Sequence, residues 1–126
     1  MNVGDRIELR VTPDPYVTVR YAGASGDFNP IHIDEEFAQS VGLPGRILHG
    51  LWSMAQVARA AADAGGGPQS LQALSVQFRG MGAIGAEVVV SGEVVSAADG
   101  VATIKLESVQ GENKLIKGAV AELRGT

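Results

Sequence analysis

The sequence predicts an α+β fold in which a curved antiparallel sheet packs around one long helix. Three observations support this prediction: a helical pattern from about Gly50 to Ala64, four later segments that alternate between apolar and polar residues, and short turns between those segments. The chain has 126 residues, enough for one domain with a core, and no linker or repeat divides it. We therefore expect a single domain over residues 1–126.

The first part of the chain predicts a strand and two short helices. The strand is indicated by three alternating apolar residues, Ile7, Leu9 and Val11. Thr18 is a candidate N-cap for a helix that ends before Gly26. Asp34 is a candidate N-cap for a second helix, Asp34–Ser40, whose acidic first turn suits the positive end of the helix dipole.

The predicted long helix runs from Gly50 to Ala64, and the run Gly65–Pro68 terminates it. Its predicted buried stripe consists of Leu51, Met54, Ala55, Ala58 and Ala62. Because most of these side chains are small, a sheet could approach the helix closely.

The second half of the chain changes to a period of two residues. Each of four segments has its apolar residues on one expected face: Leu74, Val76 and Phe78; Val88, Val90 and Val94; Ile104 and Leu106; Ile116 and Val120. Short turns such as Ala98–Gly100 and Gly111–Asn113 separate them. We therefore expect the four segments to pair in chain order as an antiparallel meander.

Composition narrows the class of protein. The chain has no cysteine, which excludes disulfides and thiolate metal sites. Its formal charge is −4 with no basic run, which argues against a nucleic-acid partner. No signal peptide or apolar run of about 20 residues occurs, so we expect a cytoplasmic protein that does not cross a membrane. A core rich in Ala and Val, with 5% aromatic residues, favours an oligomer.

A candidate acid–base pair lies between Ser25 and His32. Asp27 and His32 are five residues apart, with Pro30 restricting the segment between them. A carboxylate can orient an imidazole, stabilise its charged form or share a water with it. The alternative is that Asp27 caps a turn and His32 is structural. Asn29 is either a turn former or a side-chain donor to Asp27.

A candidate oxyanion site follows at His49–Gly50. Gly50 falls in the first turn of the long helix, where backbone N–H groups lack intrahelical partners. Its N–H can bind a carbonyl oxygen that gains negative charge, although the glycine could also serve only for close packing. Ser25 lies in no nucleophile-elbow pattern. The two histidines lack the spacing of a helical metal site, so we expect no metal.

Together, the stretches Tyr21–Asp34, Phe37–Ala38, Gly42 and Ile47–Leu51 resemble the MaoC-like dehydratase family. This family includes R-specific enoyl-CoA hydratases and (3R)-hydroxyacyl-ACP dehydratase subunits. The resemblance implies a hotdog fold, a homodimer or a heterodimer with another hotdog chain, and reversible addition of water to a trans-2-enoyl thioester. The product is a (3R)-hydroxyacyl thioester. CoA or acyl carrier protein carries the substrate, and no cofactor is implied.

The resemblance also implies roles for individual residues. Asp27 and His32 activate the water and handle the proton at the α carbon, and Gly50 N–H polarises the thioester carbonyl. Four residues are candidates for substrate binding or support of the Asp–His pair: Ser25, Asn29, His49 and Trp52.

The chain departs from the family pattern at two places. Ala58 stands where some family hydratases have a serine, and the glycine-rich stretch Arg79–Ala86 lacks the family's proline and acid. Three alternatives to an independent hydratase therefore stay open. The chain is a catalytic subunit that needs a second hotdog chain, a non-catalytic acyl-thioester binding protein, or a thioesterase.

Overall fold

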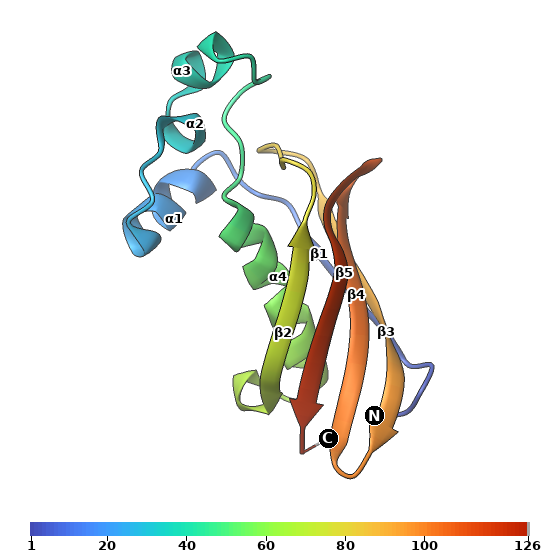
Figure 1. The fold of residues 1–126 in the computed structure, drawn as a ribbon. Coiled ribbons are helices and arrows are strands. Elements are labelled where there is room, and N and C mark those ends of the chain that lie inside the picture. Colours follow the sequence, from blue (N-terminus) through green and yellow to red (C-terminus); the bar gives the residue numbers. More distant parts are fainter. Residues whose placement is uncertain (126) are drawn as a thin grey trace.

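In residues 1–125, which the computed structural model describes, an antiparallel five-stranded sheet curves around helix α4 (Gly50–Ala64) (Figure 1). The strands are β1 (Arg6–Val11), β2 (Leu71–Phe78), β3 (Val88–Ala98), β4 (Val101–Gln110) and β5 (Asn113–Arg124). The other helices are α1 (Val17–Ser25), α2 (Pro30–Ile33), α3 (Glu35–Ser40) and the 3₁₀ helix η1 (Pro68–Ser70). Helices α1 to α3 gather beyond the N-terminal end of α4 (Figure 1). This is the predicted hotdog arrangement.

The strand order is β1-β3-β4-β5-β2, which corrects part of the predicted meander. Strands β3, β4 and β5 pair in chain order, but β2 pairs with β5, with Leu74 opposite Ala121, and not with β3. The connection between β2 and β3 spans residues 79–87, which is too long for a tight hairpin turn. It therefore carries the chain from one edge region of the sheet to the other side of β4.

A bulge in β5 corrects the predicted face of this strand. Leu106 lies opposite Ala119 but Ser108 lies opposite Ile116, so two steps along β4 match three along β5. Gly118, with φ +59°, occupies the bulge in a backbone conformation that other residues rarely adopt. As a result Ile116 and Ala119 both face the core, and Val120 turns to the other face.

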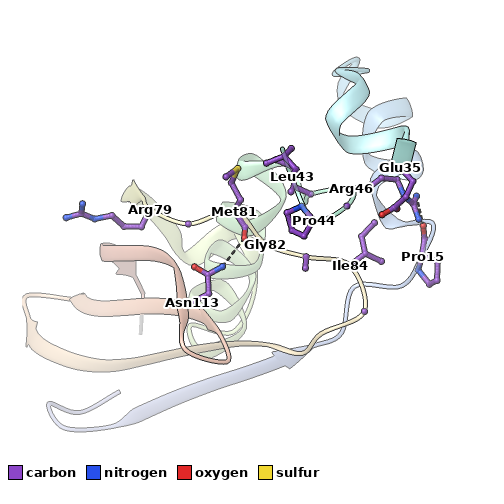
Figure 2. Close-up of a pocket in the computed structure, with 15 residues that line it drawn as sticks. Pro15, Glu35, Leu43, Pro44, Arg46, Arg79, Met81, Gly82, Ile84 and Asn113 are labelled. Carbon is purple, nitrogen blue, oxygen red and sulfur yellow. Dashed lines mark hydrogen bonds and ion pairs between the residues drawn. The ribbon is translucent and has the colours of Figure 1, made fainter. Parts of the chain in front are cut away.

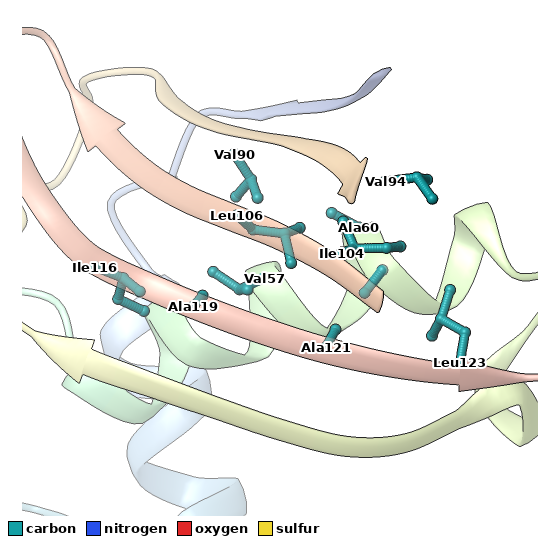
Figure 3. Packing of buried hydrophobic residues seen from close by; sticks show 11 residues of the cluster. Val57, Ala60, Val90, Val94, Ile104, Leu106, Ile116, Ala119, Ala121 and Leu123 are labelled. Atoms are coloured by element: carbon teal, nitrogen blue, oxygen red, sulfur yellow. The ribbon is translucent and has the colours of Figure 1, made fainter. Parts of the chain in front are cut away.

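The core lies between α4 and the concave face of the sheet (Figure 3). The helix contributes Val57, Ala60 and Ala61 to it, whereas Leu51 and Ala55 of the predicted stripe are exposed. The remaining members of the predicted stripe are at least partly buried: Met54, Ala58 and Ala62. The sheet contributes buried residues of β3, β4 and β5: Val90, Val94, Ile104, Leu106, Ile116, Ala119, Ala121 and Leu123. Small side chains do face the sheet, as expected, but they are those of Ala60 and Ala61, which lie outside the predicted stripe.

The short helices begin at partly different residues from those predicted. Helix α1 has Tyr16 as its N-cap, and Thr18 is buried inside the first turn, so the predicted Thr18 cap was wrong. Asp14 supports this helix start instead, because its carboxylate accepts from Tyr16 N–H at 2.8 Å. Hydrogen bonding from Arg20 lowers the pKa of Asp14 below its ordinary value. The predicted Asp34 cap is confirmed, with Asp34 accepting from Phe37 N–H at 3.0 Å.

The packing of the core predicts how much stability is lost when a buried side chain is shortened. Ile104 is fully buried between α4 and the sheet. The change Ile104→Ala should lower the free energy of unfolding by about 2–5 kcal/mol, because it removes apolar contacts and leaves a cavity. Urea unfolding at one fixed protein concentration measures this, with the exposed Val95→Ala as the control. Equal effects of the two changes would contradict the assigned core.

No helix within residues 1–125 combines the length and the apolar character that crossing a membrane requires.

Candidate active site

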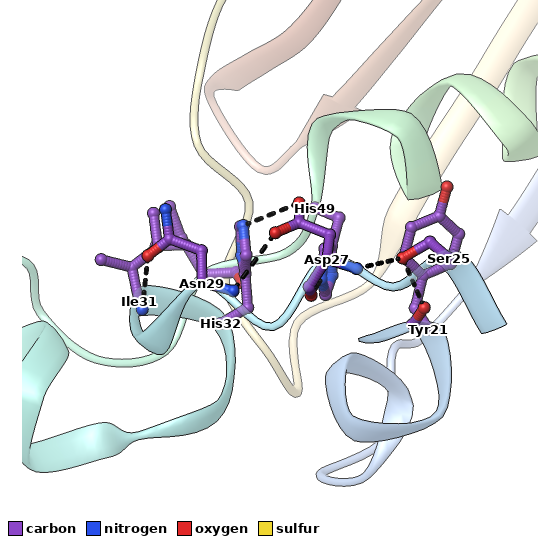
Figure 4. A network of polar contacts seen from close by, with 8 residues as sticks. Tyr21, Ser25, Asp27, Asn29, Ile31, His32 and His49 are labelled. Atoms are coloured by element: carbon purple, nitrogen blue, oxygen red, sulfur yellow. Dashed lines mark hydrogen bonds and ion pairs between the residues drawn. The ribbon is translucent and has the colours of Figure 1, made fainter. Parts of the chain in front are cut away.

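The candidate catalytic groups lie where α1, α2 and the start of α4 meet (Figure 4). Ser25 closes α1: its hydroxyl donates to the carbonyl of Tyr21 at 2.7 Å and accepts from Asp27 N–H at 3.1 Å. Gly26, at φ +81°, provides the left-handed residue that ends the helix. Ser25 therefore shapes the turn that presents Asp27, and it also lines the adjoining cavity.

Asp27 and His32 face one another across a short gap. Nε2 of His32 lies 3.9 Å from a carboxylate oxygen of Asp27. Nδ1 of His32 is 2.8 Å from the carbonyl oxygen of Ile47. Because a carbonyl only accepts, Nδ1 carries the proton and the neutral ring keeps a lone pair on Nε2. A gap of 3.9 Å is too long for a direct hydrogen bond and suits a water bonded to both groups.

Asn29 lies in the turn between these two residues. Its side-chain oxygen accepts from Ile31 N–H at 3.3 Å and so caps α2, in which Pro30 is the first residue. The backbone N–H of Asn29, and not its side-chain amide, donates to the carboxylate of Asp27 at 3.2 Å. Asn29 is therefore a turn former and not a side-chain donor to Asp27, and its backbone N–H holds the Asp27 carboxylate.

His49, one of the predicted candidates for support of the Asp–His pair, stacks on His32, an arrangement that the sequence did not predict. Its ring stacks on that of His32, with centroids 3.8 Å apart and planes inclined by 20°, and Tyr21 lies against it at 4.7 Å. Nε2 of His49 donates to the backbone carbonyl of Asp27 at 3.0 Å. Its buried Nδ1 has no hydrogen-bond partner among residues 1–125. His49 thus supports both members of the Asp–His pair.

Gly50 is the first residue of α4 and borders a cavity of about 330 Å³. The lining of this cavity consists of Tyr21, Ser25, Asp27, His49, Gly50, Leu51 and Phe78. Among residues 1–125 the N–H of Gly50 meets no acceptor, as expected for the first turn of a helix. This N–H and the helix dipole provide an anion-binding group beside Asp27.

Trp52 lies outside the cavity that Asp27 and Gly50 border. Its side chain is buried in a second apolar cluster that also contains Val17, Leu48, Val88 and Leu115. It does not line the 330 Å³ cavity. Its position favours a packing role over the predicted role in substrate binding.

The family model described as the MaoC like domain matches residues 1–116. The chain belongs to the MaoC-like domain family. Fatty acid synthase beta subunit TOXC of Cochliobolus carbonum is 35% identical over 86% of this MaoC-like chain. Peroxisomal enoyl-CoA hydratase 2 of Arabidopsis thaliana is 30% identical over 80% of it.

The MaoC-like chain spans 5% of the first of these relatives and 32% of the second. Among solved structures, a chain of the ChsH1-ChsH2 complex from Mycobacterium tuberculosis is 26% identical with a TM-score of 0.88. That match covers all of the MaoC-like chain and 99% of the other chain.

Three possible metal ligands of the MaoC-like chain lie together, although their spacing in the sequence suggested no such site. Ligand atoms of Asp27, His32 and His49 are all within 4.8 Å of one another. The two rings are stacked, so their in-plane lone pairs do not converge on one point between them. This donor set suits a water-binding pair better than a metal, and the absence of a metal stays a prediction.

Proposed function

We propose that this chain catalyses the reversible addition of water to trans-2-enoyl thioesters, giving (3R)-hydroxyacyl thioesters. The observation that carries the proposal is the combination of Asp27 and His32, 3.9 Å apart, with the N–H of Gly50, which meets no acceptor among residues 1–125, at the neighbouring cavity. Hydration needs a base for water and a donor for the thioester oxygen, and these three groups supply both. The resemblance to enoyl-CoA hydratase 2 supports the same reaction class.

In the proposed hydration, a water donates hydrogen bonds to Nε2 of His32 and to the carboxylate of Asp27. His32 removes a proton as the water oxygen bonds to C3 of the substrate. The electron pair of the C2–C3 double bond moves toward the thioester, and Gly50 N–H stabilises the oxygen that gains negative charge. The proton returns at C2, so both residues end in their starting states. Dehydration is the reverse sequence.

The direct test is a hydration assay over a series of enoyl-CoA chain lengths, followed by enoyl groups on acyl carrier protein. We expect loss of the conjugated-enoyl absorbance and formation of the (3R) product. No turnover on either carrier would contradict an independently active hydratase. Release of free thiol would indicate a thioesterase instead.

A second candidate is a catalytic subunit that works with another hotdog chain. Leu51 and Phe78, which line the cavity, are 59% and 53% exposed, so a partner could complete its wall. The solved ChsH1-ChsH2 complex, to which this chain is similar, supports this candidate. We expect a dimer by light scattering. Full activity of a purified homodimer would exclude the need for a second chain.

The third candidate, an acyl-thioester binding protein without turnover, draws on Ala58 and the glycine-rich stretch at residues 79–86. Tight binding of acyl-CoA without hydration would support it, and rapid hydration would eliminate it.

The proposed reaction needs no metal or redox cofactor, which makes a further prediction. Activity should survive prolonged dialysis against EDTA, because the water is activated by Asp27 and His32 alone. The assay compares kcat before and after dialysis, with a metal analysis of both samples. Loss of activity restored only by Zn²⁺ would assign the Asp27, His32 and His49 cluster to a metal. The cytoplasmic location stays a prediction.

A further inference from the structure

The connection between β2 and β3, residues 79–87, is held by a side chain from the end of β4. Gln110 is buried. Its amide oxygen accepts from Ala83 N–H at 2.8 Å, and its amide nitrogen donates to the carbonyls of Ala83 at 2.8 Å and Ala86 at 2.9 Å. The amide of Gln110 thus pairs with both backbone groups of Ala83, as a neighbouring strand would.

Ala83 in turn contacts the segment that orients His32. Ala83 and Ile47 form an isolated antiparallel bridge, and Leu48 N–H donates to the carbonyl of Gly82 at 2.8 Å. The carbonyl of Ile47 accepts from Nδ1 of His32 at 2.8 Å. A continuous series of short contacts therefore runs from Gln110 through Ala83 and Ile47 to the catalytic imidazole.

Packing and hydrogen bonds together hold these two segments: Gly82 lies against the side chains of Leu48 and Leu115, and Ile84 packs on the second apolar cluster. A cavity of about 800 Å³ lies between residues 43–47 and residues 79–85 (Figure 2). The second of these segments contains Gly80, Gly82 and Gly85, which leave its backbone conformationally free in the unfolded chain. Ala83 itself is exposed, so the hydrogen bonds from Gln110 are the side-chain contacts that act directly on its backbone.

We propose that Gln110 is a positioning residue for His32. It holds Ala83, and through the bridge to Ile47 it fixes the carbonyl that selects the Nδ1–H tautomer and aims Nε2 at Asp27. This proposal rests on the proposed function for its kinetic consequence, but its structural consequence can be measured without any substrate.

The variants Gln110→Glu and Gln110→Met test the proposal. Glutamate keeps the size and the acceptor for Ala83 N–H, but places a carboxylate against the carbonyls of Ala83 and Ala86. Methionine keeps the approximate length without these hydrogen bonds. We expect kcat to fall about 10- to 100-fold with KM little changed, because a small misplacement of the base costs rate more than binding.

Asn113→Ala is the matched control. Asn113 pairs with Gln110 across the β4–β5 hairpin, and its side chain donates to the carbonyl of Met81 in the same loop at 2.9 Å. It does not bond to Ala83, so kcat should stay near the wild-type value. Equal losses in the control and in the Gln110 variants would assign Gln110 to general loop stability and overturn the proposal.

The spectroscopic readout uses the two histidines of the chain. In protein labelled with ¹⁵N-histidine, we expect the Nδ1–H tautomer for His32 and the Nε2–H tautomer for His49. The Gln110 variants should shift His32 toward a mixture of tautomers and leave His49 unchanged. Folded variants with the wild-type His32 signals would overturn the proposal.

Wild-type measurements keep the proposal testable if the variants do not fold. The amide proton of Ala83 should exchange slowly, and exchange at the rate of an open loop would overturn the proposal. Failure of the proposed function has a different signature. A wild-type chain without hydration activity would refute the hydratase, while the tautomer of His32 would still decide the role of Gln110.

Discussion

Asp27→Asn should lower kcat for enoyl-thioester hydration by about two to four powers of ten, because it removes the carboxylate that shares the reacting water with His32. The fold should persist. Asn29 N–H donates to one carboxylate oxygen of Asp27, and the asparagine side-chain oxygen can accept the same hydrogen bond. KM should change little, since the carboxylate acts on water and not on the carrier. Steady-state kinetics and thermal unfolding together measure this.

Asp34→Asn is the control with the same chemical change. Asp34 caps α3 by accepting from Phe37 N–H, and asparagine is an equally good N-cap. Its kcat should match that of the wild type. His32→Gln should reduce kcat as strongly as Asp27→Asn, since both groups bind one water. Undiminished turnover by either variant would contradict the proposed mechanism.

Gly50→Pro should lower kcat by about 10²- to 10³-fold, the usual effect of losing one oxyanion donor. Proline has no backbone N–H, so this change deletes the proposed donor. Helix α4 should persist, because proline is favoured at the first helical position. His49 already has φ −65° and ψ 138°, an extended conformation that a following proline requires. Circular dichroism checks the helix, and kinetics with one enoyl-CoA measure the loss.

Gly50→Ala separates the loss of the N–H from the added bulk. Alanine keeps the N–H, and its Cβ would lie 3.4 Å from Cδ1 and 3.5 Å from Cε1 of the Phe78 ring, an ordinary contact distance. We expect a far smaller loss than for proline. Equal activity of the alanine and proline variants would show that the N–H does not stabilise the transition state.

Local chemistry made some elements predictable from the sequence. The bounds of α4 are as predicted, because His49–Gly50 opens the helix and the glycine run closes it. The cap at Asp34 and the turn at Asp99–Gly100 likewise depend on side chains or backbone angles of neighbouring residues. In each case the decisive interaction is local, so the sequence pattern contains it.

Other features depend on distant parts of the chain. The buried face of α4 was only partly predicted, because alanines surround the helix and alanine carries little information on which face is apolar. Strand β2 pairs with β5, which is distant in the sequence, and the alternating pattern of β2 does not indicate which strand will be its partner. The frame of β5 changes at Gly118, and alternation alone does not show where a bulge shifts the register.

In the candidate site, too, local features were predictable and contacts between distant residues were not. Asp27, His32 and Gly50 were predicted from one window together with the family resemblance, and the structure brings them to one place. The stacking of His49 on His32 was not predicted, because it depends on how α2 packs against the start of α4. The available signals were that both histidines of the chain fall in that window and that His49 was a candidate for support of the Asp–His pair.

The polar groups of the site occupy one unbroken stretch, residues 21–50, whereas strands β2 to β5 and the body of α4 follow it in the chain. A single genetic crossover after Gly50 would therefore transfer all of these polar groups together to a hybrid protein. The cavity-lining residues Leu51 and Phe78 would then come from the other parent. Gln110 and Ala83 both lie after that point and would be inherited as a pair. We expect recombination among relatives to diversify substrate preference faster than it damages catalysis.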